Sequence, residues 1–206
     1  MKNIRLIFLF LPLLAMNFTA VIPELTSAER KQAVDYMKKT REDLLKSIKG
    51  LSPKQLNFKS SPESWSVAEC VEHLAISETN LFGLIQNTLK EAANPARRAE
   101  IKITDKGLFD AIIDRSHKIK TQEAFVPTGR FGTHQATLKE FSTKRDAAIK
   151  YIETTPDDLR NHFFTFPDAA LGTVDSYQLL IFIAAHSKRH TLQIEEVKSN
   201  PAFPKK

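Results

Sequence analysis

The segment Asp175–Val197, DSYQLLIFIAAHSKRHTLQIEEV, has the pattern of an amphipathic helix with two histidines in its apolar stripe. Spacings of three and four residues place the stripe on one helical face. The stripe consists of Leu179, Phe182, Ile183, His186, His190, Gln193 and Val197. Imidazoles four residues apart project side by side, so both can offer a ring nitrogen to one cation. The segment therefore predicts a largely buried helix that carries part of a metal site.

A third histidine, His73, lies beside Leu74 on another amphipathic segment far upstream. If the two helices pack together, three imidazoles meet inside a bundle and leave coordination positions open for water or substrate. The alternative is that these histidines are core residues bonded to backbone or water. The pair His186 and His190 favours a shared cation, because each ring has two nitrogens to satisfy in a stripe with few polar partners.

Three neighbouring residues have two interpretations each. Cys70, the single cysteine, excludes an internal disulfide and is either a small buried hydrophobe or a thiolate ligand beside His73. Glu69, one turn before His73, either orients that imidazole or only completes a capping box. Gln193, one turn after His190, faces either the site or the helix surface.

The remaining histidines are not expected to bind metal. His117 lies among lysines at an expected helix end, where a positive charge is favourable. His134 falls in a first helical turn, and His162 falls in a loop rich in phenylalanine. Of these three, His162 is the best placed to line a pocket.

Capping boxes, prolines and glycines divide the chain into helices and loops. The expected helices span residues 26–50, 66–94, 105–118, 133–152 and 175–197. The expected loops include residues 96–104, 125–132 and 156–173. No segment shows sustained strand alternation. The sequence therefore predicts one all-α domain over residues 26–200, a helix bundle with long crossover loops.

The 206 residues are enough for one well-cored domain and a short extra segment. The chain has 30 basic and 24 acidic residues, a formal charge of +6 that is scattered along the helices. Scattered charges indicate solvated faces rather than a groove for a polyanion. Because no arm, finger or aromatic platform accompanies them, we expect no nucleic-acid partner.

Residues 1–20 have the pattern of a signal peptide. Lys2 and Arg5 precede the apolar run Leu6–Ala15, as in an export signal. The alternative is an uncleaved membrane anchor, but Asn17 and Thr19 dilute an apolar run that would need about 20 residues to span a bilayer. We therefore expect cleavage and export to the periplasm or the medium, with no other membrane contact.

Two motifs resemble those of a known family. The run Trp65–Leu74, WSVAECVEHL, resembles the first histidine motif of the DinB-like superfamily, which includes YfiT-type metal-binding four-helix bundles. The run Phe182–Ile194, FIAAHSKRHTLQI, resembles its second motif, a His-x-x-x-His on the last helix. The segment Val126–Gly132 and the helix with Arg145 resemble the middle of the family. The resemblance covers most of the chain after residue 20.

The resemblance implies a four-helix core with up-down-down-up connections. It also implies that His73, His186 and His190 bind a divalent ion, with water completing the coordination. Three imidazoles suit several metals, of which we expect zinc first and nickel second. A homodimer is a further expectation from the family.

The expected function is that of a metal-dependent hydrolase acting on a small molecule that the sequence does not identify. One alternative is a thiol-dependent S-transferase of the same superfamily, although export would separate it from cytoplasmic thiols. The other alternative is a non-enzymatic metal-binding module with a role in stress or protein interaction. Fold alone does not decide among them.

Overall fold

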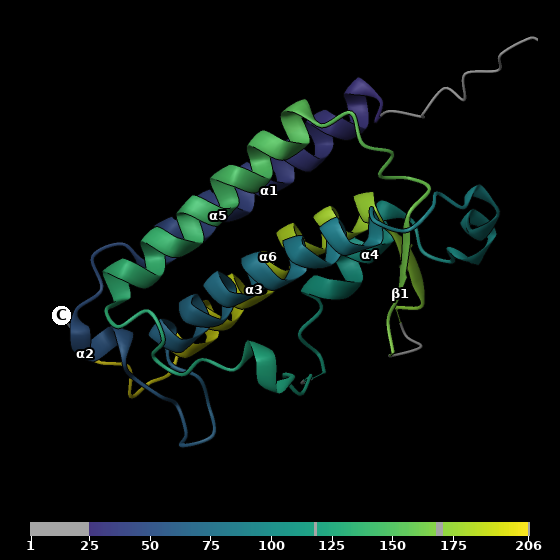
Figure 1. Ribbon diagram of the computed structural model, residues 1–206. Coiled ribbons are helices and arrows are strands. Elements are labelled where there is room, and N and C mark those ends of the chain that lie inside the picture. Colours follow the sequence, from purple (N-terminus) through teal and green to yellow (C-terminus); the bar gives the residue numbers. More distant parts are fainter. Residues whose placement is uncertain (1–24, 118, 168–170, 206) are drawn as a thin grey trace, which may run out of the picture.

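Four long helices form the core of the protein in a computed structural model that describes residues 25–117, 119–167 and 171–205. They are α1 (Ser27–Ile48), α3 (Val67–Thr88), α5 (His134–Thr154) and α6 (Ser176–Lys198). Each begins after a residue predicted as its cap, whose side chain accepts a backbone N–H of the first turn. Thus the all-α prediction is confirmed (Figure 1).

The expected signal peptide, residues 1–20, lies outside the described residues. In the part of the chain that the structure describes, no helix combines the length and the apolar character needed to cross a membrane.

Contacts at both ends of each helix pair show the relative directions of the helices. Lys38 pairs with Glu153 and Arg41 pairs with Asp146, so α1 and α5 are antiparallel. The same comparison makes α3 antiparallel to α6 and α1 parallel to α6. The contacts that establish this are His73–His186, Thr88–Ser176, Glu29–Tyr177 and Ser47–Glu195. The expected up-down-down-up order is therefore observed (Figure 1).

Because α3 and α5 point the same way, the chain between them must return along the bundle. This crossover contains the 3₁₀ helix η1 (Pro95–Glu100), the helix α4 (Asp105–Ile113) and the 3₁₀ helix η2 (Glu123–Phe125). Helix α4 packs along α6. The crossover thus brings the segment around Phe125 beside α3, next to the middle of the bundle.

The helix expected over residues 105–118 is shorter than predicted and ends at Ile113. Its end is set by Arg189 on α6, whose guanidinium donates to the carbonyls of Ile112, Asp114 and His117. A contact with a distant helix therefore draws residues 114–117 away from helical geometry. No local signal in the sequence reports such a contact.

Short elements also occur where the sequence predicted only loops. Helix α2 (Pro53–Leu56) is a single turn, η1 has six residues, and a hairpin joins β1 (Phe163–Thr165) to β2 (Thr173–Asp175). Strands of three residues are too short to show alternation. The last residue of β2, Asp175, is also the N-cap of α6, so the hairpin fixes where that helix begins.

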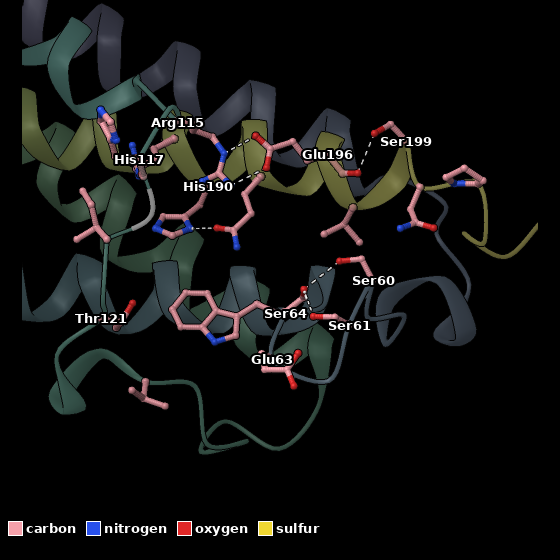
Figure 2. Close-up of a pocket in the computed structure, with 18 residues that line it drawn as sticks. Ser60, Ser61, Glu63, Ser64, Arg115, His117, Thr121, His190, Glu196 and Ser199 are labelled. Carbon is pink, nitrogen blue, oxygen red and sulfur yellow. Dashed lines mark hydrogen bonds and ion pairs between the residues drawn. The ribbon is translucent and has the colours of Figure 1, made fainter.

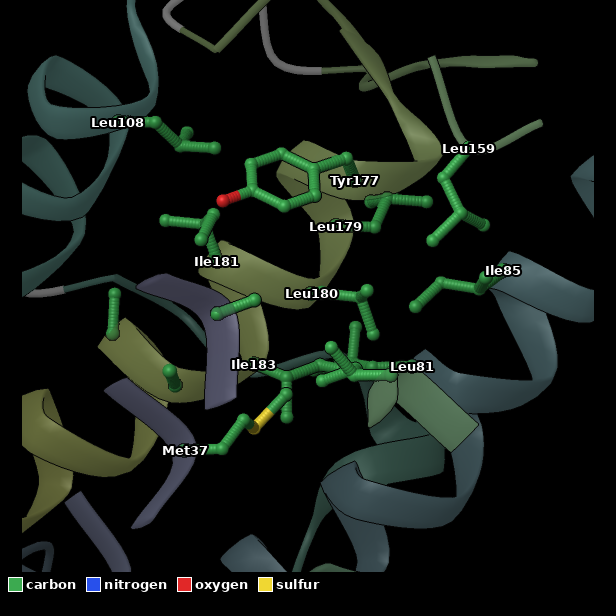
Figure 3. Packing of buried hydrophobic residues seen from close by; sticks show 14 of the residues in the cluster. Met37, Leu81, Ile85, Leu108, Leu159, Tyr177, Leu179, Leu180, Ile181 and Ile183 are labelled. Atoms are coloured by element: carbon green, nitrogen blue, oxygen red, sulfur yellow. The ribbon is translucent and has the colours of Figure 1, made fainter. Parts of the chain in front are cut away.

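The core is divided into two apolar clusters by a polar layer. One cluster fills the end of the bundle where α6 begins, and Figure 3 shows Leu180 and Ile183 of α6 among Met37 of α1 and Ile85 of α3. The other surrounds Phe141 at the opposite end. Each of the four long helices contributes one buried polar residue to the level between the two clusters. We call these four residues the arginine layer. These residues are Thr40, Glu78, Arg145 and Ser187.

Arg145 is completely buried, and its guanidinium holds the arginine layer together. Its nitrogens donate to both oxygens of the Glu78 carboxylate, to the Thr40 hydroxyl at 2.9 Å and to the Met37 carbonyl at 3.1 Å. A fifth bond reaches the Ser187 hydroxyl at 2.6 Å. A guanidinium has five N–H donors, so every one is satisfied within the protein.

Candidate metal centre

The structure brings together the three histidines that the sequence singled out. His73 projects from α3, and His186 and His190 project from α6. The Nε2 atom of His186 lies 3.2 Å from Nε2 of His73 and 3.2 Å from Nε2 of His190. One ring nitrogen from each residue lies within 4.8 Å of the others. The three imidazoles therefore point their Nε2 atoms at a common centre.

Hydrogen bonds at the far side of two rings determine which nitrogens carry protons. His73 Nδ1 lies 2.8 Å from the carbonyl oxygen of Phe125, which can only accept, so Nδ1–H donates and Nε2 has a free lone pair. His190 Nδ1 lies 2.8 Å from Oε1 of Gln193, and the same assignment follows. A neutral His186 carries its single N–H on Nδ1 or on Nε2, so its Nε2 can donate to one of the two neighbouring nitrogens at most.

This nitrogen set fits a divalent cation. Nitrogens at 2.0–2.1 Å from one ion and at tetrahedral angles are separated by about 3.3 Å, close to the 3.2 Å contacts at His186. A cation at the common centre would accept an Nε2 lone pair from each of the three rings. Phe125 and Gln193 provide the outer hydrogen bonds that usually orient metal-binding imidazoles.

Burial keeps the three rings neutral at neutral pH. It is the first cause that lowers the pKa of each imidazole, and it places the pKa values of His186 and His190 well below the usual range. The neighbouring imidazoles lower the pKa of His186 further, and His73 acts in the same way on His190. Because a metal binds the neutral imidazole, the group is ready to coordinate without first losing protons.

A cavity of about 990 Å³ adjoins the histidine group and is lined by His190, Trp65 and Gln193. The indole ring of Trp65 lies 4.7 Å from the ring of His73, centre to centre. Figure 2 shows His190 on one side of the cavity and the serines of the segment before α3 on the other. These serines are Ser60, Ser61 and Ser64. The candidate centre therefore opens on a space lined with hydroxyl groups.

The two arginines on the cavity wall are held by other groups of the protein. Arg115 makes a two-bond ion pair with Glu196, at 2.5 and 2.6 Å (Figure 2). Arg189 lines the same cavity but directs its guanidinium at the backbone carbonyls after α4. The Gln193 side chain also faces the cavity, which confirms the first of its two interpretations.

Cys70 and Glu69 do not contribute to the histidine group. Cys70 is fully buried in the apolar cluster around Phe141, and burial raises the pKa of its thiol to about 12. It is therefore the small hydrophobe of the first interpretation, not a thiolate ligand. Glu69 completes the capping box with Ser66 and pairs with Lys59 at 2.7 Å. The imidazole of His73 instead has the Phe125 carbonyl as its partner.

The other three histidines lie apart from the converging nitrogens. His117 does not end a helix, and it lines the cavity, which the sequence did not predict. The expectation that His162 lines a pocket is wrong for this cavity. His162 lies beside the hairpin, and its Nδ1 atom is 3.1 Å from the carbonyl oxygen of Thr88 on α3. His134 is the first residue of α5, and its pKa is lowered by burial.

Sequence reasoning missed Glu72, the residue next to His73. Its carboxylate is buried and accepts backbone N–H bonds from Thr128, Gly129 and Arg130 at 3.1, 3.0 and 2.9 Å. The available signal was a charged residue between Val71 and His73 in the first histidine motif, on a mostly apolar stretch. Its partners lie more than 50 residues away and could not be read from that signal.

Comparisons with known proteins give the family. YuaE of Bacillus subtilis strain 168, an uncharacterized protein, is 25% identical over 151 residues, covering 73% of this chain and 88% of YuaE. The solved structure of YfiT from Bacillus subtilis, described as a probable metal-dependent hydrolase with an unusual four-helix bundle topology, matches with a TM-score of 0.56 and 15% identity. That match covers 84% of this chain and 88% of YfiT. Because only 15% of the residues are identical, the match shows a shared fold and no more. Residues 36–194 match the model of the DinB superfamily, and the chain therefore belongs to that superfamily.

Proposed function

We propose that the protein binds one divalent metal ion, zinc in the first place, through His73, His186 and His190, and that it is a metal-dependent hydrolase. The observation that carries the proposal is the convergence of three neutral imidazole nitrogens beside a cavity of about 990 Å³. The description of YfiT, which shares the fold, supports the same class of reaction.

Three protein ligands characterise catalytic rather than structural zinc sites, because structural sites usually have four. A bound cation of this kind polarises a substrate oxygen and lowers the pKa of water. The protein's own residues supply orientation: Phe125 and Gln193 hold two of the rings, and the cavity wall beside His190 offers hydroxyl groups to a polar substrate. Trp65 packs on His73 and limits its movement.

Export belongs to the same proposal. The signal-like segment at residues 1–20 would deliver the domain outside the cytoplasm, where cytoplasmic thiols are scarce. That location supports hydrolysis over thiol transfer.

The test compares the native protein with His190→Ala and with His134→Ala, a control at a histidine outside the group. Metal content is measured by mass spectrometry, and zinc-loaded proteins are screened against esters, amides and thiol-transfer substrates. We expect one ion per chain and hydrolysis in the native and control proteins, and neither in His190→Ala, with helical content unchanged. Thiol transfer alone would support the transferase, whereas loss of the fold together with the ion would support a structural metal.

A further inference from the structure

Glu72 has a buried carboxylate whose bonds come from the backbone of one loop. The three N–H groups of residues 128–130 all donate to it, and it makes no ion pair among the described side chains. Such convergence requires successive amides to point the same way, as in an anion-binding nest. Gly129, with φ of +77°, supplies the backbone conformation that side chains rarely allow.

The same loop is attached to α3 a second time. The Phe125 carbonyl accepts from His73 Nδ1–H, and Phe125 lies three residues before the first amide that Glu72 binds. Glu72 and His73 are adjacent on α3. The two attachments therefore close a small ring of contacts, and the segment between them includes Val126, which lines the cavity. A carboxylate that fixes residues 128–130 also restricts where the Phe125 carbonyl can lie.

We propose that Glu72 is a positioning residue for the histidine centre. It acts through the loop of residues 125–130, which holds the His73 ring so that Nε2 faces His186. This inference rests on the proposed function in so far as the oriented ring serves a metal. Its structural half, the link from Glu72 to the His73 ring, applies to the metal-free protein as well.

The test uses Glu72→Gln, which keeps the side-chain length. One half of the amide still accepts a bond, but its NH₂ group opposes backbone N–H donors and breaks the nest. The matched control is Glu69→Gln, one turn away, because glutamine also completes a capping box. Both variants lose one negative charge from the same helix.

Three readouts separate positioning from a general loss of stability. In the metal-free protein, the downfield proton resonance of His73 Nδ1–H disappears in Glu72→Gln, and trypsin cleaves after Arg130 about tenfold faster. Zinc affinity, measured by chelator competition, falls about tenfold or more, the usual effect of removing an outer hydrogen-bond partner. The control keeps the resonance, the cleavage rate and the affinity of the native protein.

The two proposals fail in distinguishable ways. A native protein that binds no zinc refutes the proposed function, and the Nδ1–H resonance then decides the role of Glu72. Native binding with unchanged affinity and resonance in Glu72→Gln overturns the positioning role. Equal losses in Glu72→Gln and Glu69→Gln overturn it too, because they would reflect charge rather than the loop.

Discussion

The arginine layer and the histidine group are two buried polar regions on the same helices, and they are built in opposite ways. They are adjacent, since Ser187 follows His186 on α6. In the arginine layer each of the five N–H donors of Arg145 has an acceptor in the protein. In the histidine group the Nε2 atom of His186 lies 3.2 Å from the Nε2 atoms of both other rings, and its single N–H can serve only one of them.

Buried polar groups are normally satisfied, and one that is not requires an explanation. The arginine layer is complete without any partner from outside, so its role is to join four helices. In the histidine group the Nε2 atoms instead converge on one centre, where a shared cation would bind all three. The comparison teaches that burial and polarity alone do not mark a candidate site, whereas ligand nitrogens that converge on one point beside a cavity do.

Breaking the arginine layer has the largest expected effect on stability. Arg145→Met leaves the Glu78 carboxylate buried without its partner, so the free energy of unfolding falls by about 3–5 kcal/mol. Urea denaturation of the metal-free protein measures it. The double variant Arg145→Met with Glu78→Met removes both charges and recovers part of the loss. A loss below about 1 kcal/mol in the single variant would show that the layer does not join the helices.

Zinc binding to the histidine group has the next largest expected effect on stability. Zinc in hundredfold excess over its dissociation constant raises the free energy of unfolding by about 2.7 kcal/mol. Replacing His186, whose Nε2 contacts both other rings, removes that gain. Thermal unfolding with and without zinc is compared for the native protein and His186→Ala. Equal stabilisation of both proteins would place the ion elsewhere.

Acid lowers the free energy of unfolding of the metal-free protein through the histidine group. The folded pKa of His186 lies well below its unfolded value near 6.5, so below that pH the unfolded chain takes up a proton that the folded chain does not. The stabilising difference is complete above pH 6.5 and is lost as the pH falls. Between pH 7.5 and 5.5 the loss amounts to about 1.4 kcal/mol for this residue. Urea titrations of native protein and His186→Gln, with chelator present, should differ by that amount, and parallel pH curves would contradict it.

The smallest effect is expected at Cys70. Cys70→Ala removes a buried sulfur from the apolar cluster and lowers the free energy of unfolding by about 1 kcal/mol. Zinc affinity stays that of the native protein, because the thiol lies outside the converging nitrogens. Chelator competition checks this, and a weaker affinity would reinstate the thiolate interpretation.

The sequence predicted the long helices and the pairing of His186 with His190 because both depend on local patterns. Capping residues such as Ser66 and Asp175 act within one turn, and the spacing of His186 and His190 alone places them on one face. His73 was assigned from its apolar neighbours and from the family motif. These signals are short in range and survive without knowledge of packing.

The parts that the sequence did not predict depend on contacts between distant segments. Glu72 accepts hydrogen bonds from the backbone N–H groups of residues 128–130. Arg189 donates to backbone carbonyls in the range 112–117, and α4 ends within that range. Both partners are backbone groups, which leave no mark in the sequence. The cavity has the same origin, since its walls come from α6 and two loops.

X-ray absorption of the zinc-loaded protein tests the central claim most directly. If His73, His186 and His190 share one ion, the spectrum shows nitrogen neighbours at about 2.0–2.1 Å with the outer scattering of three imidazoles. His186→Ala should lose that signature. A shell of sulfur near 2.3 Å, or a fit with a single imidazole, would contradict the account.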